Sequence, residues 1–241
     1  MARQARWSVA CAAAEVLYSL GDPVSLVLLL IGALLAATLQ GVTHALVAGR
    51  AGDPRPAREG RTKLDPRHHL DPFGAVAALI AGIGWTKPLD PPERSSRATV
   101  IGVLLSGALV NIALGLGLLV AYSVAGGVAL GGGRGVVIFL QYGFIAGSLG
   151  VRALFLIGLS LLFFGALALV PLPPLPGGRL LFALAPNSVG WQKARYQLVE
   201  RNIGVAILLA LLLIPLGGPQ ALLPDLLDTL LGPLVALVTG G

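Results

Sequence analysis

The sequence predicts an all-α polytopic membrane protein with about four to six transmembrane helices, a re-entrant hairpin and interfacial helices. Of its 241 residues, 56% are hydrophobic and only 12% are charged, whereas a soluble domain carries about 25% charged residues. Several apolar stretches approach the length of about 20 residues that a helix needs to cross a bilayer. The single cysteine, Cys11, excludes a disulfide framework and a cysteine-based metal site.

Four stretches are expected to cross the membrane, namely residues 23–48, 98–124, 151–170 and about 203–216. The first follows Gly21-Asp22-Pro23, and a proline within the first turn is typical of a helix start. Residues 73–84 are apolar but number only 12. That length is too short to span, so it favours a re-entrant or half-inserted hairpin.

The remaining apolar segments leave two alternatives, lying in the interface or crossing. Asp225, Asp228 and Pro233 interrupt the apolar tail 219–239, which is therefore expected to be interfacial or spanning. We interpret residues 7–20 as an interfacial or loosely inserted helix, 136–147 as an interfacial helix or the entry to the next span, and 191–202 as an amphipathic helix. The resulting division is an N-terminal helix within 1–22, a membrane core over 23–217 and a C-terminal apolar helix within 218–241.

The segment 171–179, PLPPLPGGR, contains four prolines and two glycines. This composition predicts irregular backbone, followed by a short apolar turn over 180–186. Non-helical backbone at membrane depth is tolerated only where protein buries it or where it lines a cavity. The segment therefore indicates a functional site at the end of the third span.

Basic residues are distributed unevenly between the two sides of the predicted bundle. Loops 49–97 and 172–202 hold nine and four of the 17 Lys and Arg residues, and the opposite side holds Arg3, Arg6, Arg134 and Arg152. The positive-inside rule places the two loops on the cytoplasmic side. We expect the membrane to be a prokaryotic plasma membrane. Given the net charge of +6, we expect loop 50–67 to attract anionic lipid headgroups, and we expect no binding of nucleic acid.

Two polar residues interrupt the first span. Gln40 and His44 lie four residues apart in LQGVTH, a spacing that places both on one helical face. Zinc proteases use this spacing for two histidines in H-E-x-x-H.

Six motifs follow one another in the order found in a known family. They are QGVTH (40–44), THALVAGRAGDP (43–54), GRTKLDPRHHLDPFG (60–74), GWTKPL (84–89), GALVN (107–111) and ALVPLPPLPGGR (168–179). From about residue 30 to 205 the chain resembles the site-2 proteases, which are intramembrane zinc metalloproteases. The resemblance implies a site-2-protease-like membrane core.

The resemblance also implies that this chain is a degenerate member. Gln40 stands at the first histidine of H-E-x-x-H, Gly41 at the catalytic glutamate, and Pro176 at the aspartate that supplies the third zinc ligand. Only His44 is retained. Catalytic zinc sites use three protein ligands, and glycine cannot accept a proton from bound water. We therefore expect no metal, no cofactor and no hydrolysis, and regard these four positions as vestigial.

The retained motif residues are candidates for binding, and they are Asn111, His69, Asp71, Pro173, Pro174 and Gly177. In active relatives the matching asparagine lies near the catalytic centre, and the proline-rich loop pairs with extended substrate. A substitute metal site built from His44, His69 and Asp71 is one alternative.

The leading interpretation is a pseudoprotease that acts as a binding or structural subunit of a membrane complex. Its expected partner is a transmembrane helix of another protein or other subunits of the complex. One alternative is an active intramembrane metalloendopeptidase with a rearranged metal site. Another is a transporter or channel, with a hydrated path lined by Gln40, His44 and Asn111.

Overall fold

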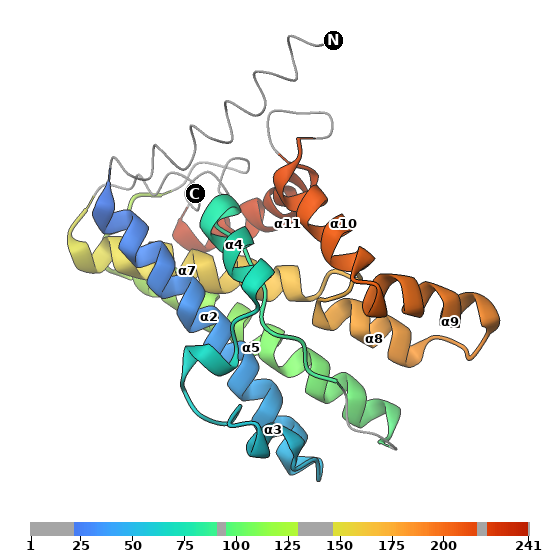
Figure 1. Cartoon of the computed structure of the whole chain (residues 1–241). Coiled ribbons are helices and arrows are strands. Elements are labelled where there is room, and N and C mark those ends of the chain that lie inside the picture. Colours follow the sequence, from blue (N-terminus) through green and yellow to red (C-terminus); the bar gives the residue numbers. More distant parts are fainter. Residues whose placement is uncertain (1–21, 91–94, 130–146, 216–220, 241) are drawn as a thin grey trace, which may run out of the picture.

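The described residues form a helical bundle without a β-strand. A computed structural model describes residues 22–90, 95–129, 147–215 and 221–240 (Figure 1). Four of its helices are long and apolar enough to cross a membrane, and a bent pair of helices could provide a fifth crossing. These four are α2 (Pro23–Arg50), α5 (Arg97–Val124), α7 (Leu149–Ala168) and α11 (Leu222–Thr239). The structure confirms an all-α polytopic membrane protein.

Side-chain caps explain where the three central helices begin. The Asp22 carboxylate accepts from the Ser25 backbone N–H, and Pro23 occupies the first turn of α2. Ser96 and Ser148 cap α5 and α7 in the same way, through hydroxyl oxygens that accept backbone N–H bonds. Each cap satisfies a donor that the helix itself leaves unpaired. The predicted starts of these spans agree with the structure within two residues.

Helices α2, α5 and α7 pack closely because small residues lie where they meet (Figure 1). A Cβ on Gly115 of α5 would lie 2.6 Å from the Leu162 nitrogen of α7. A Cβ on Gly32 of α2 would lie 2.7 Å from the Ser160 Cβ, also on α7. Lipid gives helices no hydrophobic reason to associate, so such close contacts supply much of the attraction between them.

The segment that contains the short helix α4 (Pro72–Ala81) leaves the bundle and returns to the point where it left. The Asp71 carboxylate caps it by accepting from Gly74, and Gly82 ends it with a φ of 70°. Leu70 pairs with Thr86 in an isolated antiparallel bridge. Ten residues of helix extend about 15 Å, half of the bilayer's hydrocarbon thickness of about 30 Å. This return geometry is the one that the predicted re-entrant hairpin requires.

Two sequence predictions after the third span are wrong in part. Helix α8 (Pro176–Leu184) occupies the end of the supposed irregular segment and most of the supposed turn over 180–186. Pro176 is compatible with a helix because it occupies the first position, where a backbone N–H has no partner to lose. The predicted span over 203–216 is also too long, since α10 (Ile203–Leu213) has only 11 residues.

Two short helical elements precede α10 and lie at an angle to it. They are α9 (Val189–Arg195) and the π-helix η2 (Tyr196–Glu200), bent by 67° from α10. The polar segment after α2 contains two further short elements, α3 (Arg55–Arg58) and the 3₁₀ helix η1 (Pro66–His68). Predicted segment 7–20 and most of 136–147 lie outside the described residues, and the proposed domain boundaries stay predictions.

The close contact between α5 and α7 predicts a large effect of a single methyl group. Gly115→Ala places that group against the backbone of α7, which cannot rotate away, so we expect a loss of about 1–3 kcal/mol. Gly117→Ala is the matched control, because its Cβ meets nothing within 4 Å. Thermal unfolding of both variants in detergent micelles measures the difference. Equal melting temperatures would contradict this account of the packing.

Candidate functional site

The polar residues of α2 form a buried network with α5 and with the return segment of α4. The Asn111 amide nitrogen donates to the Ala36 carbonyl at 3.0 Å and to Gln40 Oε1 at 3.3 Å. Gln40 Nε2 in turn donates to Thr86 Oγ1 at 3.3 Å. Gln40 and Asn111 have no exposed surface. The amide at position 40 therefore links three separate parts of the chain.

His44 is also held by α5. Its Nε2 lies 3.1 Å from the Leu104 carbonyl oxygen, so a hydrogen on that nitrogen is donated to the backbone. Gly107 makes room for this contact, because a Cβ there would lie 2.8 Å from His44 Nε2 and 2.6 Å from the Gln40 carbonyl. His44 is 3% exposed. His44 is therefore buried beside the two amides.

The space beside Gly41 holds the His69 ring. A Cβ on Gly41 would collide with that ring, nearest to Nδ1. His69 is fully buried, and its Nε2 donates to the Lys63 carbonyl at 2.9 Å. Its Nδ1 has no hydrogen-bond partner among the described residues. Burial lowers the pKa of His69, although the Lys63 carbonyl opposes the shift, so the neutral ring is favoured.

The proline-rich segment is packed inside the protein. Pro173, Pro174, Pro176 and Gly177 are all buried, and the peptide bond between the first two is cis. A Cβ on Gly204, at the start of α10, would lie 2.5 Å from the Pro173 carbonyl oxygen. The start of α10 therefore packs closely against the backbone of this segment.

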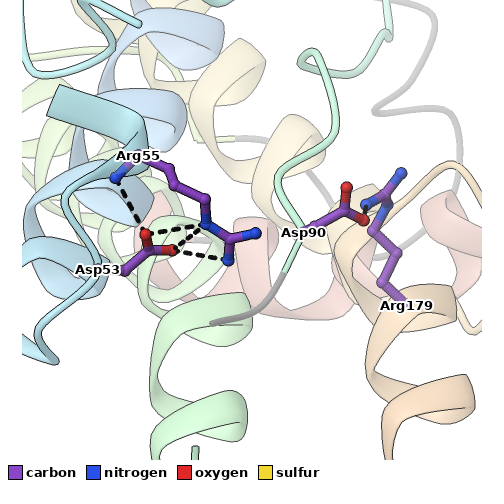
Figure 2. A network of polar contacts seen from close by, with 4 residues as sticks. All are labelled: Asp53, Arg55, Asp90 and Arg179. Atoms are coloured by element: carbon purple, nitrogen blue, oxygen red, sulfur yellow. Dashed lines mark hydrogen bonds and ion pairs between the residues drawn. The ribbon is translucent and has the colours of Figure 1, made fainter. Parts of the chain in front are cut away.

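Charged residues tie the loop after α4 to neighbouring elements. Arg61 donates to the Lys87 carbonyl at 2.6 Å and to the Pro88 carbonyl at 3.1 Å, and burial lowers the pKa of Arg61. Two residues on, Asp90 forms an ion pair with Arg179 of α8 (Figure 2). The polar segment after α2 and the start of α8 consequently lie at one end of the bundle.

A second ion pair stabilises the turn after α2. Arg55 donates to both carboxylate oxygens of Asp53, with Nε at 3.0 Å from Oδ1 and Nη2 at 2.9 Å from Oδ2 (Figure 2). These hydrogen bonds lower the pKa of Asp53. Asp53 belongs to the motif at residues 43–54, and its role in the structure is to hold the chain as it leaves the membrane-spanning helix.

A comparison with curated proteins decides the family. Over 194 residues the chain is 34% identical to a protein of Bacillus subtilis (strain 168) named "Putative zinc metalloprotease YwhC", covering 79% of this chain and 82% of that protein. This chain belongs to the site-2 protease-like family. No protein-family model matches the chain, and no solved structure matches it.

The residues of this site-2 protease homologue do not fit a catalytic zinc ion. At the positions implied by the resemblance stand one imidazole, one neutral amide and one proline, which has no side-chain donor. Within the described ranges, no group of three or more His, Cys, Asp or Glu residues could hold a metal. His44, His69 and Asp71 thus do not assemble the substitute site considered from the sequence, and Asp71 caps α4 instead.

Three contributors to the site were missed by sequence reasoning. Thr86, Leu104 and Gly107 all contact Gln40 or His44. Thr86 lies within the motif at 84–89 and Gly107 within the motif at 107–111, so the resemblance to the family could have pointed to both. Leu104 contributes only its backbone carbonyl, which no side-chain pattern reveals.

The contact between Gly41 and His69 predicts a coupled pair of substitutions. Gly41→Ala forces the buried ring aside and should lower the melting temperature clearly, because overpacking costs about 1–3 kcal/mol. In His69→Ala the space is free, so adding Gly41→Ala should cost much less. Gly49→Ala, on the same helix with nothing within 4 Å, is the control. Additive losses in the double variant would argue against the contact.

Proposed function

We propose that this chain is a catalytically inactive site-2 protease homologue that serves as a membrane-embedded binding or structural subunit. The observation that supports this most is the state of the catalytic positions. Gln40 is bonded to Thr86 and Asn111, His44 to a backbone carbonyl, and Gly41 is packed against His69. Every one of these groups has a partner within the protein, and the partners come from three different elements.

Hydrolysis by a metallopeptidase requires a Lewis acid and a base that acts on bound water. Glycine at position 41 offers no carboxylate, and the space that a side chain would enter is filled by the His69 ring. Rotation of the His69 ring would open that space but would not supply the missing carboxylate. Three separate substitutions, at positions 40, 41 and 176, therefore act against the same chemistry, which favours a role that does not need it.

Metal content tests the inactive state directly. The chain is purified from zinc-supplemented cells, dialysed against a weak chelator and analysed by elemental mass spectrometry. We expect far less than one zinc per chain, with no change in His44→Ala. The Bacillus relative, purified in parallel, controls for loss of metal during handling. Stoichiometric zinc that disappears in His44→Ala would instead support the active alternative with a rearranged site.

The binding role is supported by an apolar groove between α2 and α4. Its volume is about 210 Å³, somewhat larger than an engineered cavity of about 150 Å³ that accommodates benzene. It is lined by Leu30, Ala33, Leu34 and Ala37 of α2, by Leu70, Gly74, Ala75, Ala78, Leu79 and Trp85 around α4, and by Phe164 of α7.

This groove lies next to the vestigial positions, since Ala37 is one turn before Gly41 and Leu70 follows His69. Exposed apolar residues flank it, including Val27 and Ile31 of α2 and Val76 of α4. A large apolar side chain of a partner's transmembrane helix would fill the groove, while the flanking residues pack beside it. We assign the partner contact to this surface.

Site-specific photocrosslinking tests the binding role in native membranes. A photoreactive residue replaces Leu34 at the groove, and the control replaces Leu109 of α5, which is also apolar and exposed. We expect discrete crosslinked proteins from position 34 that position 109 does not give. Crosslinks to lipid alone from both positions would refute a bound helix, and would leave the metal result unaffected.

A further inference from the structure

A polar half-helix and an apolar half-helix meet at Asn202. On the apolar side, α10 contains no charged residue, and its buried residues are only Gly204, Leu208 and Leu212. On the polar side, α9 and η2 carry Lys193, Arg195 and Glu200. The axis turns by 67° between the two halves, and Asn202 adopts the left-handed conformation with a φ of 56°.

The change of direction follows the change of polarity. Helix α10 exposes aliphatic side chains, which hydrocarbon accommodates without cost. The charges of α9 and η2 would be costly at the centre of a bilayer. A bend at the junction lets the apolar half remain in hydrocarbon while the polar half leaves it. The region that accepts apolar, aromatic and charged groups together is the membrane interface.

The side chains of α9 and η2 suit that region. Trp191 packs edge-on against Phe182 of α8, with ring centroids 5.8 Å apart, which holds the two helices together. Val189 and Tyr196 are exposed. The Arg201 guanidinium carbon lies 5.6 Å from the centre of the Tyr196 ring. An aromatic ring with a cation over its face is a group that is stable where apolar and aqueous phases meet.

The charge on this surface has one sign in excess. Residues 189–202 contain Lys193, Arg195 and Arg201 against a single acid, Glu200, and all four are exposed. Basic groups close to a membrane surface attract anionic lipids. The Asp90–Arg179 ion pair places the start of α8, the helix that leads into α9, at the same end of the bundle as the basic loop 50–67.

We propose that α9 and η2 form a binding surface for anionic phospholipid headgroups at the membrane interface. Lys193, Arg195 and Arg201 contact the phosphates, and Trp191 and Tyr196 anchor the helix at headgroup depth. Helices α8 and α9 extend sideways from the bundle (Figure 1). In this proposal that extension rests on the lipid. This surface does not depend on the proposed function, since neither the groove nor the vestigial positions take part.

Quenching of Trp191 by brominated lipids tests the proposal. The full chain is placed in lipid nanodiscs of phosphatidylcholine that contain equal small fractions of either brominated phosphatidylglycerol or brominated phosphatidylcholine. The quenching lost in Trp191→Phe is the signal from that residue. We expect the glycerol lipid to quench it more strongly, by about twofold or more, because local basic charge enriches anionic lipid.

Two charge variants locate the effect. Lys193→Gln/Arg195→Gln/Arg201→Gln should make the two brominated lipids equal, whereas Arg58→Gln/Lys63→Gln/Arg67→Gln, which removes the same charge from loop 50–67, should leave the preference intact. The proposal is overturned if Trp191 is quenched by neither lipid or by both equally in the unmodified chain. A preference that survives the first variant, or is lost in the second, overturns it as well.

Discussion

The close approach of α2, α5 and α7 is the constraint on which the other features depend. In lipid, helices gain little from burying apolar surface, so they associate where small residues let their backbones meet. Gly32 and Gly115 create that contact with α7, and Gly107 creates it between α5 and the polar part of α2. Without these positions the helices would stand farther apart, and the hydrogen bonds of the site would exceed their working distances.

The polar network exists because the helices are this close. Asn111 reaches both a carbonyl and the Gln40 side chain across the α2–α5 contact. In this region two buried acceptors, Asn111 Oδ1 and His69 Nδ1, have no hydrogen-bond partner among the described residues. Such groups are costly in a low-dielectric interior. Both groups lie beside residues 40 and 41 of α2, so the polar groups of this region are satisfied only in part.

Sequence reasoning was strongest for the long helices and weakest for short ones. The spans beginning at Pro23 and Arg97 were predictable because hydropathy and a capping residue agree on the same place. The start of α8 at Pro176 was missed because proline is compatible with a helix only at its first positions. The end of α10 was missed because hydropathy reports an apolar run and not the residue at which the helix stops. The packing of His69 against Gly41 joins residues 28 positions apart, which no periodicity predicts.

The bridge between Leu70 and Thr86 has a consequence for how the chain is inserted during synthesis. Because the segment that contains α4 leaves and returns at one point, it adds an even number of membrane crossings, whatever its depth. The helices before and after it, α2 and α5, therefore run in opposite directions in either case. An error in the depth of α4 would not invert α7 or anything that follows, so the topology of the later helices does not depend on how deeply this short segment inserts.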